Sequence, residues 1–266
     1  MRKIAVVNMK GGVGKTTTAV QLAARLARPD EQRVLLIDVD PQGNIGHALN
    51  VQHRATVREL LLGEASLDDV IVRDVRPHLD VLAATPAAFT LESQLAGKMQ
   101  RETLLARRLE QLDGYQAVVI DTSPAMSLLT YNAMLYATEY IVPVGMDRMA
   151  IAGARQTVDG VHEIRELWPA HPLDLLAVLP TTVNMTTNAS RATYAALEQD
   201  DELRARLYRP GIRQCLDLTY ANASRQTIWE YSPRSRAAED YASFVEFIGG
   251  HGDRRESQDT TSQSVA

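Results

Sequence analysis

The segment from Asn8 to Thr18 contains the residues best suited to bind a phosphate group. Three glycines between Gly11 and Gly14 come directly before Lys15 and Thr16. Glycines let backbone N–H groups close around an anion, and the N-terminus of a following helix adds the positive end of its dipole. In such a loop we expect the lysine ammonium to reach the β- and γ-phosphates and the threonine hydroxyl to bind Mg²⁺.

Three acidic residues are placed where they could serve the same phosphates. Asp38 and Asp40 follow the apolar run 34–37, and Asp121 follows the apolar run 117–120. If these runs are parallel strands, the acids lie at the carboxyl edge of the sheet, where open α/β folds bind ligands. One acid could then hold the Mg²⁺ shell and another could orient a water for attack on the γ-phosphate. Solvated turn acids, or an acid that caps the next helix, are the alternatives.

Apolar runs and amphipathic segments alternate along the chain, as strands and helices do in α/β proteins. The expected strands cover residues 4–7, 33–37, 79–83, 115–120, 140–144 and 175–179. The expected helices cover residues 19–26, 57–62, 91–112 and 151–168, one that begins near 190, and a last one that ends near 248. This alternation predicts a doubly wound, mostly parallel sheet with helices on both faces.

Composition places the chain among ordinary globular proteins. Of 266 residues, 45% are hydrophobic and 23% are charged, which suits one large domain over residues 1–248. Residues 249–266 are polar and rich in Gly, Ser and Thr, so we expect a disordered tail. The single cysteine, Cys215, excludes an internal disulfide and a metal cluster made of cysteines alone. No apolar run is long enough to span a membrane and no signal peptide is visible, so a cytoplasmic location is expected.

The phosphate-loop sequence departs from the standard pattern in a specific way. Met9 stands where that pattern has its first glycine, and Lys10 adds a second lysine. Residues 10–17 (KGGVGKTT) thereby resemble the deviant Walker A motif of the ParA/MinD ATPases. The resemblance implies that Lys10 points across a dimer interface to the nucleotide of a partner subunit. Residues 38–44 (DVDPQGN) resemble the A′ motif of the ParA family, which implies that Asp40 positions the attacking water.

Three further segments extend the resemblance, which covers residues 2 to about 248. Asp121 would have the Walker B role, although Ser123 replaces the first proline of the family's usual Asp-x-Pro-Pro. Residues 145–149 (GMDRM) stand where the family often has Gln-x-Glu followed by Tyr or Phe, a segment that tends to contact the partner subunit or a regulator. Residues 230–241 resemble the C-terminal signature of ParA proteins.

The Thr- and Asn-rich stretch 180–191 permits two interpretations. It resembles the ParA segment between strand and helix that touches adenine, so Thr181 and Thr182 are candidates for that contact. Alternatively, the stretch is a loop whose polar side chains cap the helix that begins near Ser190.

A local excess of arginine lies between Leu203 and Arg236, in a chain of net charge -5. A basic patch without a base-reading motif suits salt-sensitive, sequence-independent binding of DNA phosphates. Alternatively, these arginines pair with acids elsewhere or lie on different faces. Asp217 stands where the family often has an arginine that contacts DNA in relatives. The candidate DNA-binding residues are Arg204, Arg206, Arg209, Arg213, Arg225, Arg234 and Arg236.

The resemblance implies a partition ATPase that dimerises around ATP and Mg²⁺, binds DNA without sequence preference, and segregates plasmids or chromosomes with a ParB-like activator. It would be associated with the nucleoid. Because the chain starts on its first strand, we expect no N-terminal helix-turn-helix. A ParA-like ATPase that positions a protein cargo, or a MinD-like regulator, is the alternative; the polar tail disfavours membrane binding. The residues expected to bind ATP are Lys10, Gly11, Gly12, Val13, Gly14, Lys15, Thr16, Thr17, Thr181 and Thr182. Those expected to act in catalysis are Lys10, Lys15 and Asp40, and those expected at the metal are Thr16, Asp38 and Asp121.

Overall fold

A seven-stranded sheet forms the centre of the computed structural model, which describes residues 1–27, 33–147 and 149–262. The strand order is β3-β4-β2-β5-β1-β6-β7, and every neighbouring pair is parallel except β3 and β4. The strands are β1 (Arg2–Val6), β2 (Val34–Asp38), β3 (Ile71–Arg76), β4 (Leu79–Leu82), β5 (Ala117–Asp121), β6 (Glu139–Gly145) and β7 (Asp174–Thr181). The predicted α/β fold with a mostly parallel sheet is confirmed.

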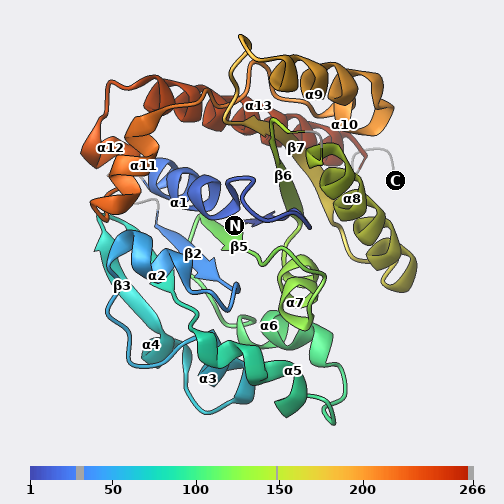
Figure 1. Cartoon of the computed structure of the whole chain (residues 1–266). Coiled ribbons are helices and arrows are strands. Elements are labelled where there is room, and N and C mark those ends of the chain that lie inside the picture. The colour runs from blue at the N-terminus through green and yellow to red at the C-terminus, as the bar shows by residue number, and fades with distance from the viewer. Residues whose placement is uncertain (28–32, 148, 263–266) are drawn as a thin grey trace.

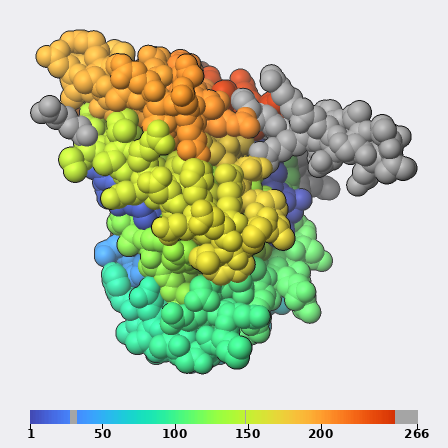
Figure 2. Space-filling view, turned by 90° about the vertical axis from the view of Figure 1, so that its right-hand side faces the viewer, coloured from blue at the N-terminus to red at the C-terminus, as the bar shows by residue number. Residues whose placement is uncertain are grey.

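Helices cover both faces of this sheet (Figure 1). Alternate side chains of each strand enter two separate cores, as the pleat requires: Ala5 packs with α7 and α8 on one face, whereas Ile4 packs with α1 and α13 on the other. Figure 2 shows the side of the molecule that carries α8. The longer helices are α1 (Lys15–Leu26), α7 (Leu128–Tyr136), α8 (Ala150–Leu167), α9 (Asn188–Gln199), α11 (Leu216–Ala223) and α13 (Arg236–Ser262). The shorter ones are α2 (Asn44–Leu49), α3 (Val57–Leu62), α4 (Leu67–Val70), η1 (Pro86–Thr90), α5 (Leu91–Gln94), η2 (Arg101–Thr103), α6 (Leu104–Arg108), α10 (Asp201–Ala205) and α12 (Ile228–Tyr231).

The prediction of one helix over residues 91–112 is wrong. The segment forms three short pieces, α5, η2 and α6, and Gln100 between them has a left-handed backbone with φ 54°. The buried amide of Asn132 on α7 stabilises the break, because it accepts the Leu105 N–H at 2.8 Å and donates to the Arg101 carbonyl at 2.9 Å. A distant side chain therefore replaces the helical hydrogen bonds that the local pattern implied.

The structure also contains helices that the sequence analysis did not predict, among them α2, α7 and α11. The antiparallel edge strand β3 was not predicted, and the last helix, expected to end near Ile248, continues to Ser262. This helix enters the segment for which we expected disorder, and the remaining residues 263–266 lie outside the described part of the chain. Within the described ranges, no helix is both long and apolar enough to cross a lipid bilayer.

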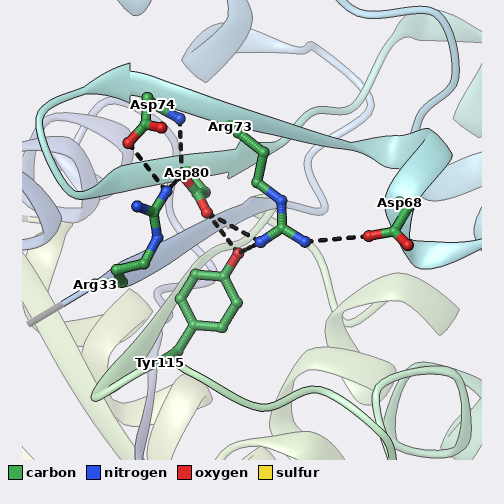
Figure 3. Close-up of polar contacts among 6 residues, drawn as sticks. All are labelled: Arg33, Asp68, Arg73, Asp74, Asp80 and Tyr115. Atoms are coloured by element: carbon green, nitrogen blue, oxygen red, sulfur yellow. Dashed lines mark hydrogen bonds and ion pairs between the residues drawn. The ribbon is translucent and has the colours of Figure 1, made fainter.

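A buried carboxylate fastens the edge hairpin to the parallel sheet (Figure 3). Asp80 on β4 is fully buried and accepts hydrogen bonds from the Tyr115 hydroxyl at 2.6 Å and from the Asp74 N–H at 2.8 Å. Arg33 and Arg73 form ion pairs with the same carboxylate. Burial alone would raise the pKa of Asp80, but the hydrogen bonds from Tyr115, Asp74 and the arginines outweigh it and hold the pKa below its usual value.

Asp80→Asn is expected to lower the free energy of unfolding by about 3 kcal/mol, because it removes the buried charge that Arg33 and Arg73 share and leaves them only the exposed acidic partners Asp74 and Asp68. The matched control is Asp74→Asn, which removes an exposed partner of Arg33 and is expected to cost less than about 1 kcal/mol. Urea denaturation of both variants measures the difference. Equal effects for the two substitutions would contradict this account of the hairpin.

Candidate functional site

The loop between β1 and α1 has the conformation of a phosphate-binding turn. Gly12 and Gly14 have φ values of 74° and 85°, a region that only glycine enters without strain. The loop delivers the chain into α1 at Lys15, so the helix N-terminus and its free N–H groups face the same space. This agrees with the role that the sequence assigns to residues 10–17.

Lys15 is held inside the loop with its ammonium directed back at the loop's own backbone. Its Nζ donates to the Lys10 carbonyl at 2.9 Å, and the side chain is largely buried. Burial lowers the pKa of Lys15, while the nearby charges of Asp121 and Asp40 act in the opposite direction. A buried ammonium is stabilised by a neighbouring anion, so a phosphate in this loop would remove an electrostatic cost.

Asp38 and Asp121 end adjacent strands and lie opposite one another in the β2–β5 register. Both are fully buried. The Asp38 carboxylate accepts the Asp40 N–H at 2.9 Å and the Ile45 N–H at 3.1 Å, so it shapes the turn into α2. Burial and then the charge of Asp121 raise the pKa of Asp38 well above its usual value.

Asp121 has one carboxylate oxygen that is free to bind a metal ion. Its Oδ2 accepts the Thr16 hydroxyl at 2.6 Å, whereas its buried Oδ1 has no hydrogen-bond partner among the described residues. Burial raises the pKa of Asp121 to about 7, and the hydrogen bond from Thr16 limits the rise. An unpartnered carboxylate oxygen beside a threonine hydroxyl is the donor set that Mg²⁺ prefers when nucleotide phosphates complete its shell. The two side chains therefore fit the predicted metal.

Asp40 lies in a cavity of about 490 Å³ that opens beside the phosphate loop. Its carboxylate accepts the Gln42 N–H at 2.9 Å, which orients the side chain within the turn. The cavity is also lined by residues that the sequence reasoning did not assign, from α2, α11 and the turn that follows α11. Among them are Asn44, His47, Leu218, Asn222 and Gln226. Asn44 belongs to the motif over residues 38–44, but no local pattern indicates that α11, about 200 residues away, covers the loop.

Lys10 does not line this cavity. Its N–H donates to the Asn8 side chain at 2.8 Å, and its ammonium forms an ion pair with Asp147, in the loop between β6 and α8. The neighbouring Met9 N–H donates to the Thr157 hydroxyl on α8 at 3.1 Å. The two lysines of the motif are therefore directed to different sides of the loop.

Thr181 and Thr182, at the end of β7, use their hydroxyl groups to bind backbone carbonyls. The Thr181 hydroxyl donates to the Val13 carbonyl of the phosphate loop at 2.9 Å, and the Thr182 hydroxyl donates to the Thr181 carbonyl at 2.6 Å. Thr187 is the N-cap of α9 and accepts the Ser190 N–H at 3.2 Å, so the capping interpretation of this stretch is confirmed for that residue. An adenine contact at Thr181 and Thr182 stays a prediction.

Most of the arginines predicted to bind DNA have partners within the subunit. Arg204 pairs with Asp201, and Arg209 pairs with Glu198. Two more are engaged elsewhere: Arg213 pairs with Glu239 and Asp240 at the start of α13, and Arg225 donates to the Asn50 side chain at 2.7 Å. Among the described residues, four of the seven candidates form no ion pair: Arg206, Arg225, Arg234 and Arg236.

Comparison with known proteins agrees with this geometry. Residues 1–171 match the AAA domain family. The chain is 32% identical over 253 residues to the sporulation initiation inhibitor protein Soj of Bacillus subtilis, which covers 94% of this chain and 98% of that protein. It is 36% identical over 249 residues to the chromosome-partitioning ATPase Soj of Thermus thermophilus, which covers 93% and 95%.

Solved structures show the same fold. A cobyrinic acid a,c-diamide synthase from Mycobacterium smegmatis, with bound ATP analog and magnesium, superposes with a TM-score of 0.78 at 30% identity, covering 92% of this chain and 93% of that one. Similarity over nearly the whole length of both Soj proteins shows that this chain belongs to the ParA/Soj family of partition ATPases.

Proposed function

We propose that the protein binds ATP between two subunits, holds DNA without sequence preference in that dimeric state, and releases it on hydrolysis. The observation that carries the proposal is that the two lysines of the phosphate loop lie on different sides of it. Lys15 lines the cavity beside the phosphate loop, whereas Lys10 does not line it and forms an ion pair with Asp147 on another side of the loop. Light scattering with a non-hydrolysable ATP analogue tests the proposal, which requires a dimer that forms only with nucleotide.

The phosphate loop and the three strand-end acids have distinct tasks in the hydrolysis that we propose. Lys15 and the loop N–H groups bind the phosphates, and Thr16 and Asp121 would hold Mg²⁺. The ion would neutralise charge on the β- and γ-phosphates. Asp40, fixed by the Gln42 N–H, orients a water for attack in line with the leaving group. Asp38 keeps the Asp40 turn in place through its two backbone contacts.

The proposed cellular role is segregation of a plasmid or chromosome by a nucleoid-associated ATPase. A ParB-like activator would stimulate its hydrolysis of ATP. The relatives named Soj support the partition role. The ion pairs of Arg204, Arg209 and Arg213 support weak DNA binding, because a guanidinium already bound to a carboxylate contributes less to a phosphate contact. A dimer that joins two such surfaces would double the phosphate contacts and make retention depend on ATP.

Arg234→Glu combined with Arg236→Glu is expected to weaken ATP-dependent DNA retention by about tenfold or more on every sequence, and Asp217→Arg is expected to strengthen it. Retention should fall steeply between low and physiological salt for all proteins. The matched control is Arg107→Glu with Arg108→Glu on α6, which makes the same charge change outside the arginine-rich segment. Filter binding at several salt concentrations measures the effect.

A wild-type ATP dimer that retains no DNA even at low salt would overturn the DNA part of the proposal. The second candidate, an ATPase that positions a protein cargo, would then take its place. The ion pairs that occupy Arg204, Arg209 and Arg213 are the observation that favours this candidate.

A further inference from the structure

The Lys10–Asp147 ion pair joins two segments that are each fixed within one subunit. On the lysine side, Asn8 accepts the Lys10 N–H at 2.8 Å and donates to the Pro143 carbonyl at the end of β6 at 2.7 Å. A Cβ on Gly153 of α8 would lie 2.7 Å from the Lys10 Cβ, so α8 approaches this backbone more closely than a side chain would permit. The base of Lys10 is thus held against its own subunit.

Asp147 is anchored on the other side of the pair. Its Oδ1 also accepts the Met149 N–H at 2.8 Å, and its carbonyl accepts the Thr193 hydroxyl of α9 at 3.2 Å. Contact with the Lys10 ammonium holds the pKa of Asp147 below its usual value, so the carboxylate is ionised at neutral pH. Two contacts that do not involve Lys10 therefore hold Asp147.

This arrangement conflicts with the role proposed for Lys10 in the ATP dimer. To neutralise the phosphates of a partner's nucleotide, the ammonium must leave Asp147 or bring that carboxylate with it. The first route breaks an ion pair, and the second places a negative charge beside negative phosphates. Both routes oppose closure of the dimer.

We propose that Asp147 is an intrasubunit counter-ion that retains Lys10 in the nucleotide-free subunit and opposes formation of the ATP dimer. The inference rests on the proposed function of Lys10 and adds a residue that regulates it. Asp147 thereby sets a threshold: dimers form only when bound nucleotide attracts Lys10 more strongly than this carboxylate does.

The exposure of the Lys10 and Asp147 side chains sets the expected effect of the ion pair on dimerisation. Lys10 and Asp147 have side chains that are 25% and 54% exposed, so the pair belongs to the weak class of surface ion pairs. Its loss is expected to change an equilibrium by up to about fivefold. Because a symmetric dimer breaks two such pairs, Asp147→Asn is expected to raise the dimerisation constant by up to about 25-fold. High salt should reduce this gain, since screening already weakens the pair in the wild type.

The test measures dimerisation by sedimentation with Mg²⁺ and a non-hydrolysable ATP analogue, on four full-length proteins. Asp147→Asn keeps an oxygen that can accept the Met149 N–H, so the start of α8 is preserved. Asp147→Glu keeps the charge and is expected to stay nearer to the wild type. Asp159→Asn makes the same chemical change at an exposed position of α8 and is expected to match the wild type.

A second readout needs no nucleotide. Amine-reactive labelling followed by mass spectrometry reports the accessibility of Lys10, with Lys98 as the internal reference. Labelling of Lys10 is expected to rise at least twofold in Asp147→Asn and to be unchanged in Asp159→Asn.

The outcomes separate this inference from the proposed function. If the wild type forms an ATP dimer and Asp147→Asn forms it no more readily, the counter-ion role is overturned while the dimer stands. If neither protein dimerises with nucleotide, the proposed function fails and the regulatory role fails with it, even where Lys10 labelling rises. Dimers that form more readily in Asp147→Asn, together with the rise in labelling, support the inference.

Discussion

Asp40→Ala protein is expected to bind ATP with nearly wild-type affinity while its hydrolysis rate falls by about 10³-fold. Asp40 lines the cavity and its carboxylate accepts the Gln42 N–H, but among the described residues it makes no hydrogen bond to the phosphate loop. Its removal therefore withdraws an interaction made with the attacking water and leaves the phosphate contacts in place. The ATP dimer should accumulate, because slow hydrolysis delays its dissociation. Nucleotide affinity and turnover, measured on the same preparation, test both halves of the prediction.

Asp40→Asn is the control for the shape of the turn. Asparagine retains an oxygen that can accept the Gln42 N–H, so a loss of turnover in this variant reports the charge rather than the loop. Unchanged turnover in Asp40→Ala would remove Asp40 from the reaction. A loss of ATP affinity would assign it to binding instead.

Lys15→Ala is expected to reduce ATP affinity by about 10³-fold, because phosphates in the loop would lose the buried ammonium that faces them. Lys10→Ala is expected to bind ATP normally as a monomer and to form no ATP dimer, since its ammonium lies outside the cavity. Titration with a fluorescent ATP analogue measures affinity, and light scattering measures dimerisation.

Lys98→Ala is the matched control for both measurements. The Lys98 ammonium donates to the Leu62 carbonyl, and Lys98 is not among the described residues that line the cavity beside the phosphate loop. A Lys10→Ala protein that dimerises normally would refute the action of Lys10 on a second subunit. Equal losses of ATP affinity in Lys10→Ala and Lys15→Ala would show that both lysines serve one nucleotide.

Sequence reasoning predicted those elements whose conformation is determined by residues close together in the chain. The phosphate loop and the strand-end acids lie within short segments, and the glycines and apolar runs around them specify both conformation and burial. The parallel sheet then brings Asp38 and Asp121 into register, as the carboxyl-edge rule implies. Distances between the acids, and which of them keeps a free oxygen, depend on contacts that only the folded chain creates.

The predictions that were wrong or incomplete concern contacts between residues that are far apart in the sequence. The helix predicted over residues 91–112 is interrupted because Asn132, on another helix, takes its hydrogen bonds. The arginine-rich segment reads as one basic patch, but Arg213 is paired with Asp240, which lies 27 residues further along the chain. The pairing of Lys10 with Asp147 spans 137 residues. Long-range polar contacts of this kind leave no periodic signal in a single sequence.

The strand order has a consequence for the synthesis of the protein. β1, which leads into the phosphate loop, pairs only with β5 and β6, so its two neighbours are residues 117–121 and 139–145. A ribosome adding roughly 5–20 residues per second needs on the order of 10 s after β1 to reach those strands. During that interval the residues of the phosphate loop have been synthesised, but the strands that pair with β1 have not. ATP can therefore assist folding only after the middle of the chain has emerged.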